Sequence, residues 1–516
     1  MSYFLTLAKY YKQVGYWGGP SLIALILYWP GLLAWFQKDD FAWLGLRELV
    51  HSPRELVWAL FAPLSQGTIR TLSERVFFMS FSGLFGLHAL PYRIWIFLTG
   101  FVTLVVLCAV CAKLTRSRAA GFWAAVLWIV NSENAYVFSW TAIYYELLCA
   151  LFLLSALWLL IRYAETGERR FFIAQWAVYL AGFLVLELNV VYPALALMYA
   201  LCFAPGIIRK TIPMFVPAGL YTVLHMLTAP LLTSGPYKMS WDLSVVPTFW
   251  TYWKLALGPN RLIYAGIHPS LFRSSLAVLL MGGLLGFLAW TIARRQWLTL
   301  FFAAWFVIVL APVLPLRDHI TDYYVTIPTV GLAMWGSWAV VTGWRAGPLG
   351  RATAVALMGV YLAVNIPIAR IASQAFNNNS HRIRAMLYGV VALSAQQPQK
   401  IILLTGINRD LFWDAIWSRP FRLFGRNEIF LIKEECTDIV AALPPELVPT
   451  FFVTRANARI ALDGGRAALY DVSGEQVRAI SSEYLKNTAS SSAIAGPRSL
   501  KKPVSASSPL PAVAAP

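Results

Sequence analysis

Long apolar stretches recur along most of the chain and constrain its fold more than any other feature. A helix that crosses a membrane needs about 20 apolar residues, or fewer where irregular backbone caps it. The stretches that meet this rule are residues 17–36, 91–112, 119–131, 144–161, 171–186, 189–204, 211–230, 275–293, 298–315, 323–342 and 352–371. Only 13% of the residues are charged, which is about half of the share in soluble domains. The sequence therefore predicts an all-α polytopic membrane protein with about eleven transmembrane helices.

Basic residues flank alternate ends of these stretches and predict the orientation. They are Lys9, Lys12, Lys113, Arg116, Arg118, Arg162, Arg169, Arg170, Arg209, Lys210, Arg294, Arg295, Arg345 and Arg351. The short loops 132–143 and 187–188 contain no Lys or Arg. The positive-inside rule then places the N-terminus in the cytoplasm and the C-terminus outside. The net charge of +18 is thus a topology signal, so we expect a lipid bilayer and no nucleic acid as partner. The simple architecture favours a bacterial inner membrane as the location.

This orientation gathers the acidic residues of the spans on the outer face. Those at span ends are Asp39, Asp40, Glu133, Glu187, Asp318 and Asp322, and Glu146 lies about one turn inside the fourth span. A charged side chain at the centre of a span costs about 2.5 to 3.5 kcal/mol on insertion scales, so such groups tend to line a cavity. The sequence predicts an acidic cavity open to the outer face.

Two adjacent carboxylates, Asp39 and Asp40, follow the first span directly. One carboxylate at the mouth of a water-accessible cavity is suited to take a proton from a substrate. The alternative is a helix cap, because Asp is favoured at that position and Phe41 begins an apolar run. The sequence does not separate the roles of the two residues.

Two predicted outer loops are long. Residues 37–90 contain stretches 44–61 and 75–87 with apolar residues at helical spacing, which predicts helices lying in the membrane interface. Residues 231–274 place Lys238, Lys254, Arg261, His268 and Arg273 among aromatic side chains. These cations either hold a lipid phosphate or form an ordinary aromatic belt with snorkelling bases.

The character of the chain changes after the last span. Residues 1–375 form the predicted membrane domain. Residues 376–485 contain β-like runs at 400–405, 428–432 and 450–453 and a helical segment at 410–417, which predicts a small α/β domain outside the membrane. The Ser-, Ala- and Pro-rich remainder, 486–516, is expected to be disordered.

Several segments resemble, in order, those of the GT-C glycosyltransferases, membrane enzymes that take a sugar from a polyprenyl-phosphate carrier. The pattern is most similar to the membrane domain of O-mannosyltransferases with tetratricopeptide repeats and to their bacterial relatives, over about residues 17–345. The matching segments are Asp39-Asp40-Phe41, Ser132-Glu133-Asn134-Ala135, Tyr145-Glu146-Leu147-Leu148, Glu187 with Pro193, and the run from Asp322 to Gly331. No tetratricopeptide repeat is found here.

The resemblance implies an inverting single displacement in which Asp39 or Asp40 is the general base. The donor would be a polyprenyl-phosphate sugar and the acceptor a protein, lipid or glycan, with no metal and no other cofactor. Substrate binding falls to Glu133, Glu146, Glu187, Asp322 and Tyr323. For Glu133 and Glu146 the alternative is solvation of a loop and a hydrogen-bonded span end, and for Glu187 it is a structural role between two short spans.

Three cations of the family pattern are missing here, since Leu186, Tyr144 and Tyr323 occupy their positions. Arg317 and His319 lie nearby and are candidates to bind the donor phosphate instead, unless they are interface anchors paired with Asp318 or Asp322. The rival functions are a lipid-linked saccharide transporter or flippase, and an inactive scaffold on the same fold. A transporter would place charges deep in the bilayer and show internal repeats.

Overall fold

The computed structural model describes residues 2–64, 67–229, 235, 237–258, 270–474 and 476–489. It divides into two compact units. The first comprises the chain up to Ala34 together with Ser52–Asn377, and the second comprises Trp35–His51 and the chain from Asn378 onward. The segment that carries Asp39 and Asp40 therefore groups with the C-terminal part of the chain.

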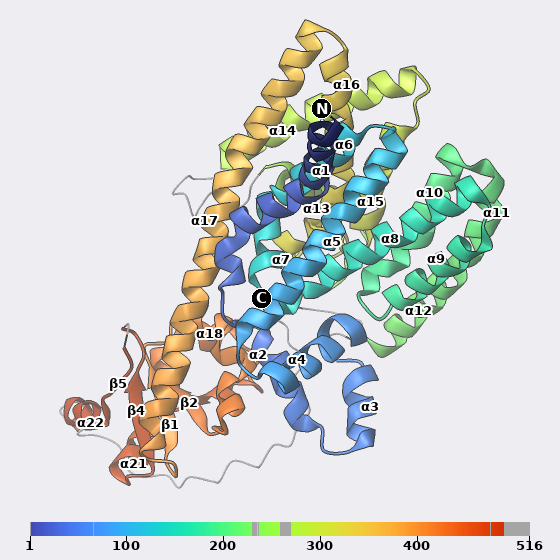
Figure 1. The fold of residues 1–516 in the computed structure, drawn as a ribbon. Coiled ribbons are helices and arrows are strands. Elements are labelled where there is room, and N and C mark those ends of the chain that lie inside the picture. Colours follow the sequence, from blue (N-terminus) through green and yellow to red (C-terminus); the bar gives the residue numbers. More distant parts are fainter. Residues whose placement is uncertain are drawn as a thin grey trace. The chain divides into compact units, whose positions relative to one another are not determined.

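Each of the eleven predicted spans contains a helix in the described part of the chain (Figure 1). These helices are α1 (Ser2–Leu32), α5 (Ala89–Thr115), α6 (Arg118–Ile129), α8 (Tyr144–Thr166), α9 (Arg169–Gly182), α10 (Tyr192–Phe203), α12 (Phe215–Thr228), α14 (Ser270–Ala293), α15 (Leu298–Leu310), α16 (Pro328–Arg345) and α17 (Pro348–Ala395). Among the described residues, five helical segments are long and apolar enough to cross a membrane. The protein is thus a multi-pass membrane protein, while the number of spans stays a prediction.

Local sequence signals define where several of these helices begin and end. The hydroxyl of Ser117 accepts a hydrogen bond from the Ala120 N–H and caps the start of α6. Gly167 ends α8 at φ 70°, in the left-handed region that glycine adopts without steric cost. Pro328 and Pro348 begin α16 and α17, at a position where the missing N–H of proline costs nothing.

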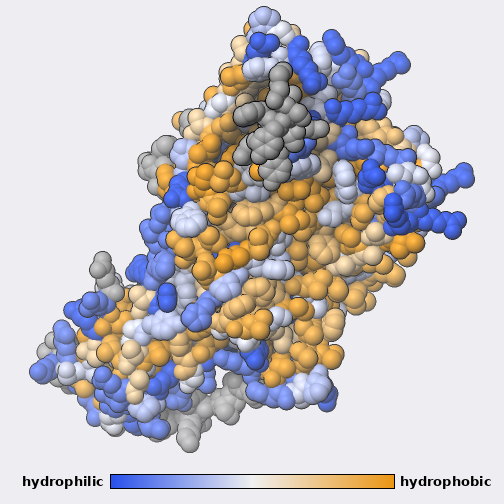
Figure 2. All heavy atoms as spheres, viewed as in Figure 1, coloured by the Kyte–Doolittle hydropathy of each residue, from blue (hydrophilic) through white to orange (hydrophobic). Residues whose placement is uncertain are grey.

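The core of the first unit lies where α5 contacts α6 and α8 and where α6 contacts α16. Gly121 of α6 lies so close to the Cys108 carbonyl of α5 that a Cβ atom would collide with it. By contrast, α12 exposes large apolar side chains such as Leu220, Val223 and Leu227. Figure 2 shows hydrophobic side chains over much of the visible helical surface of this unit. Such a surface is expected of helices that face lipid tails.

Shorter elements fill the connections of the first unit. They are α3 (Pro53–Phe61), the π-helical turn η2 (Thr71–Val76), α4 (Phe77–Phe85), η3 (Ser132–Asn134), α7 (Ala135–Ser139), η4 (Thr141–Ile143), η5 (Glu187–Val191), η6 (Pro205–Ile207), α11 (Ile208–Thr211), η7 (Ile212–Met214), α13 (Val245–Leu257), η9 (Ala311–Val313) and η10 (Asp322–Val325). Helices α3 and α4 fall in the stretches predicted as interface helices. Arg261 and His268 lie outside the described residues, as does the side chain of Arg273.

The second unit contains a five-stranded sheet in the order β3-β2-β1-β4-β5. The strands are β1 (Ile401–Thr405), β2 (Ile429–Ile432), β3 (Phe452–Val453), β4 (Ala467–Asp471) and β5 (Arg478–Ala479). All neighbouring pairs are parallel except β4 with β5. Leu403 of β1 pairs with Phe430 and Leu469 and lies in the core that α21 (Arg455–Asp463) helps to cover.

The other elements of this unit are α2 (Asp40–Leu44), η1 (Gly45–Leu49), α18 (Arg409–Asp414), η11 (Ile416–Ser418), η12 (Pro420–Phe424), η13 (Lys433–Glu435), α19 (Thr437–Ala442), α20 (Val448–Phe451) and α22 (Ser481–Ala489). The β-like runs 400–405 and 428–432 coincide with β1 and β2. The run 450–453 is half helix, because α20 continues to Phe451 before β3 begins. The sequence patterns did not predict β4 or β5.

Candidate active site

The two adjacent carboxylates have different surroundings. Asp40 is fully buried, and its Oδ2 accepts a hydrogen bond from the Gln37 N–H at 3.0 Å. Asp39 is half-buried and stands at the N-cap of α2, yet its side chain makes no capping hydrogen bond. The helix-cap alternative is therefore not realised at Asp39, and Asp40 holds the turn that precedes the helix.

A cation lies directly beside Asp39 but is paired elsewhere. Lys38 adopts a left-handed backbone with φ 56°, and its Nζ lies 2.8 Å from Oδ1 of Asp414 in α18. Oδ2 of Asp414 accepts a hydrogen bond of 2.8 Å from the Asn379 amide, which also donates to the Gln37 side chain at 3.1 Å. No hydrogen bond or ion pair of the Asp39 carboxylate is formed within the described residues.

The electrostatic balance around Asp39 favours its neutral form more than in water. Burial raises the pKa of Asp39 to about 6, the Lys38 charge lowers it and the Asp414 charge raises it. A general base works best when its pKa is close to the operating pH. An exposed Asp with a pKa near 4 is a weaker base than Asp39 in this environment.

A second cluster of charges, in the first unit, is centred on Arg70. Its Nε lies 3.1 and 3.0 Å from the two oxygens of Glu187, and its Nη1 lies 2.8 Å from Oε1 of Glu74. The guanidinium also lies over the ring of Tyr145, 4.0 Å from the centroid. Electrostatic interactions extend from Arg70 and Glu187 to Glu146, the next residue on α8. Below, the term Arg70 cluster denotes Arg70, Glu74, Arg75, Tyr145, Glu146 and Glu187.

The Arg70 cluster holds polar atoms with unused hydrogen-bonding capacity. Oε2 of Glu74 and Oε2 of Glu146 are buried and have no hydrogen-bond partner among the described residues. The same is true of Nε and Nη1 of Arg75, whose Nη2 donates to the Thr68 carbonyl at 2.7 Å. Because unpaired buried polar groups cost free energy, each such group in a native structure suggests a missing ligand or water. The cluster offers both acceptors and donors.

Burial and pairing shift the ionisation of the cluster in opposite directions. Burial raises the pKa of Glu74 to about 7, although Arg70 opposes the shift. Burial lowers the pKa of Arg75. The carboxylates of Glu187 and Glu74 hold the pKa of Arg70 well above its usual range in spite of burial. Arg70 is therefore a permanent cation, whereas Glu74 is partly protonated at neutral pH.

The remaining acids and aromatic residues of the predicted site lie near this cluster. Tyr145 interacts electrostatically with Tyr323, and Tyr252 does so with Asp322 and Glu146. Asp322 and Tyr323 belong to η10, which contacts η3, the turn that carries Glu133. The rings of Tyr136, Trp140 and Tyr324 surround that of Tyr323 at centroid distances of 6.1, 6.1 and 5.0 Å. Aromatic rings and carboxylates together are suited to bind the apolar faces and hydroxyls of a sugar.

The two residues predicted to replace the missing cations differ from each other. Arg317 is exposed and lies 3.4 Å from Asp318 and 3.7 Å from Asp242. His319 is buried, with its ring 4.1 Å from that of Tyr237. Burial lowers the pKa of His319 to about 4, so at neutral pH its side chain carries no positive charge. Their phosphate-binding role stays a prediction.

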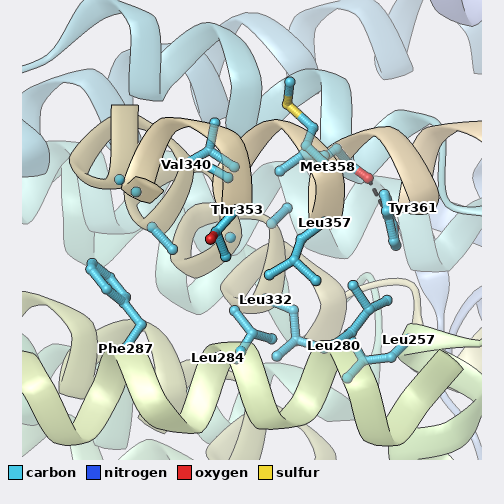
Figure 3. Close-up of a pocket in the computed structure, with 18 of the residues that line it drawn as sticks. Leu257, Leu280, Leu284, Phe287, Leu332, Val340, Thr353, Leu357, Met358 and Tyr361 are labelled. Carbon is cyan, nitrogen blue, oxygen red and sulfur yellow. Dashed lines mark hydrogen bonds between the residues drawn. The ribbon is translucent and has the colours of Figure 1, made fainter. Parts of the chain in front are cut away.

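An apolar cavity of about 550 Å³ lies in the first unit between α14, α16 and the first half of α17. Figure 3 shows Leu280, Leu284 and Phe287 of α14 on the side of the cavity opposite Leu357 of α17. At one end stands Tyr361, whose hydroxyl accepts a hydrogen bond of 3.0 Å from the Asn131 amide. The size is within the range of about 300 to 1,000 Å³ that ligand pockets occupy.

Sequence reasoning missed Arg70, Glu74 and Arg75. The first two are four residues apart and form an ion pair on one turn, and opposite charges at that spacing were a usable signal. The ion pair between Arg70 and Glu187 joins residues that are 117 positions apart in the sequence. Nothing in the local sequence predicts it.

Comparisons with known proteins agree with the fold. No protein-family model and no curated protein matches the sequence. The apo oligosaccharyltransferase of Archaeoglobus fulgidus has a similar structure, with a TM-score of 0.50, 10% identity and coverage of 89% of this chain and 69% of that one. ArnT of Cupriavidus metallidurans, solved with undecaprenyl phosphate bound, gives a TM-score of 0.44 at 12% identity over 89% of this chain and 93% of that one.

The chain shares the fold of this archaeal oligosaccharyltransferase, which agrees with the fold that the sequence resemblance predicts. At 10% identity the likeness concerns the fold alone. Substrate and mechanism depend on the residues of this chain.

Proposed function

We propose that this protein transfers a sugar from a polyprenyl-phosphate carrier to an acceptor on the outer face of the membrane. The observation that carries the proposal is the carboxylate of Asp39. It is half-buried, makes no capping hydrogen bond and has its pKa raised to about 6 by burial. In a chain with the GT-C fold, this is the carboxylate best suited to act as a base.

The reaction is a single displacement with inversion. An acceptor hydroxyl or amine attacks the anomeric carbon of the donor, and a new bond forms from that carbon to the acceptor oxygen or nitrogen. The bond from the anomeric carbon to the phosphate oxygen breaks with its electron pair, so polyprenyl phosphate leaves. Asp39 takes the acceptor proton. The transition state has oxocarbenium character and develops negative charge on the departing phosphate.

We assign recognition of the sugar phosphate to the Arg70 cluster. Sugar hydroxyls are hydrogen-bond donors that match the unpaired oxygens of Glu146 and Glu74, and phosphate oxygens are acceptors that match the unpaired N–H groups of Arg75. Arg70 and Glu187 orient these groups. On this assignment Arg75 supplies a positive charge that the family pattern places elsewhere.

We assign the isoprenoid tail to the apolar cavity between α14, α16 and α17. Its lining is apolar except for a few groups such as Asn131, Thr353 and Tyr361. The apolar side chains that line the cavity are suited to contact a hydrocarbon chain. No polar group of the carrier is required along most of its length.

The test of the function is transfer of labelled sugar from a panel of polyprenyl-phosphate sugars by purified protein in lipid discs, with a membrane extract as acceptor. Asp39→Asn should lower the turnover number by about 100- to 10,000-fold, as expected for loss of a general base. Asp463→Asn, in an exposed ion pair with Arg459, is the matched control and should leave it unchanged. An Asp39→Asn variant with wild-type turnover would exclude the mechanism. No transfer from any donor would favour the transporter or scaffold alternatives.

The tail assignment has its own test. Gly336→Val places a larger side chain in the cavity at a point where a Cβ meets only ordinary contact with Leu127. It should raise the KM for long-tailed donors several-fold and leave short-tailed donors unaffected. Gly359→Val on α17, where no atom lies within 4 Å of a Cβ, is the control. Equal effects on both tail lengths would refute the assignment.

A further inference from the structure

The second unit holds the segment that carries Asp39 through several independent contacts. The Trp35 N–H donates to the Ser380 hydroxyl at 2.9 Å, and the Trp35 ring packs against Tyr388, with centroids 5.9 Å apart. Farther along, Nη2 of Arg422 donates to the carbonyls of Phe41 and Ala42 at 3.3 and 3.1 Å. These carbonyls belong to α2, so Arg422 fixes the helix that follows Asp39.

The charged groups around Asp39 interact with different partners. Asp40 accepts the Gln37 N–H, and Arg422 is engaged by α2 carbonyls with Glu48 interacting electrostatically beside it. Lys38 and Asp414 are the two groups whose charges act on the Asp39 carboxyl among the described residues. They form one ion pair with each other, with side-chain exposures of 30% and 18%.

This arrangement matters because Lys38 is next to Asp39 in the sequence. Because the Asp40 carboxylate already accepts the Gln37 N–H, an adjacent ammonium that is not held elsewhere would pair with the Asp39 carboxylate. Such a pair would lower the basicity of that carboxylate and occupy the oxygen that must accept a proton. Asp414 instead holds Nζ of Lys38 at 2.8 Å, and Asn379 fixes Asp414 in turn.

We propose that Asp414, supported by Asn379, is a positioning residue for the transfer reaction: it draws Lys38 away from Asp39 and so keeps the base unpaired. The inference rests on the proposed function of Asp39 and assigns a role to the C-terminal part of the chain. In this view, Asp414 of the second unit does not bind substrate. It sets the ionisation of Asp39, which the N-terminal segment contributes to that unit.

The test breaks the same ion pair from either side. In Asp414→Asn, Lys38 is released toward Asp39, so the acidic limb of the pH–rate profile should move to lower pH by roughly one pH unit, and turnover at neutral pH should fall. In Lys38→Met the positive charge is lost, so the limb should move to higher pH by a similar amount. The double variant should lie between them. Asp463→Asn is the control for an Asp→Asn change in the same unit.

A merely structural role would predict a different outcome. Loss of the ion pair would then lower turnover and unfolding temperature alike in both single variants, with the acidic limb unmoved or moved in the same direction. That result would overturn the inference even if the wild type transfers sugar. If the wild type transfers none, the proposed function fails separately, and pH-dependent labelling of Asp39 by a carbodiimide, followed by peptide mass spectrometry, still measures its ionisation in each variant. Unshifted labelling midpoints would refute the role of Asp414.

Discussion

The segment around Asp39 and the Arg70 cluster both bury carboxylates, but they differ in the group with which the nearest cation pairs. In the cluster, the cation is the centre: Arg70 binds Glu187 through both carboxylate oxygens and Glu74 through one. In the Asp39 segment, the nearest cation, Lys38, binds Asp414. The catalytic candidate is left without a partner among the described residues.

The difference shows what each arrangement is suited to do. Charge-assisted hydrogen bonds from an Arg to carboxylates hold these groups in place, which serves binding and orientation. An acid with no partner and a raised pKa can take up and release a proton near neutral pH. Burial raises the pKa of a carboxyl in both regions, and the placement of the cation decides whether that carboxylate is paired.

Removal of the central cation should have the largest effect on stability. Arg70→Gln leaves Glu187 and Glu74 without their ion pair, and breaking a buried pair from one side costs about 3 to 5 kcal/mol. We expect a clear drop in the thermal unfolding temperature in lipid discs. Arg70→Lys keeps the charge but loses the planar guanidinium that reaches both carboxylates at once, so its drop should be smaller. An unchanged unfolding temperature in Arg70→Gln would show that the cluster does not stabilise the fold.

The pH dependence of stability should reveal Glu74. Its folded pKa of about 7 lies above the ordinary value of 4.5, so its contribution is complete below about pH 4.5 and is lost as the pH rises through 7. The full shift corresponds to at most about 3 kcal/mol. The unfolding temperature of the wild type should therefore fall relative to that of Glu74→Gln across this window. Parallel curves for the two proteins would contradict the shift.

Neutralising the base should affect stability in the opposite sense from Arg70→Gln. Because the pKa of Asp39 is raised to about 6, its charge destabilises the folded state relative to the unfolded state, and this penalty is complete above about pH 6. Asp39→Asn removes that charge, so its unfolding temperature at pH 8 should equal or slightly exceed that of the wild type. A marked loss would indicate that Asp39 has a structural role and would weaken its assignment as the base.

The smallest effect on stability is expected from the cation of the Asp39 segment. Lys38 and Asp414 are partly exposed, and such pairs contribute about 0.2 to 1 kcal/mol. Lys38→Met should thus change the unfolding temperature far less than Arg70→Gln. If the two changes were equal, the contrast between the two regions would not hold.

Much of the fold followed from local patterns. Every predicted span contains a helix. A long apolar run favours the lipid, and in lipid the backbone N–H and C=O groups can bond only to one another, as they do in a helix. The runs at 400–405 and 428–432 became β1 and β2 because their apolar residues are buried in the sheet. Strand β4 was missed, since its run of Ala467–Asp471 begins with two alanines, which are depleted in strands, and its pairing with β1 is nonlocal.

The candidate site divides in the same way. The sequence by itself determined a membrane helix bundle and marked Asp39, Asp40, Glu146 and Glu187 as acids that require a reason, because charge near a bilayer is costly. Only the tertiary structure decided which cation each acid meets. Arg70 reaches Glu187 across 117 positions, and Lys38 reaches Asp414 from the far end of the chain. Ion pairs depend on distances of a few ångströms between segments that folding brings together, and no local pattern encodes them.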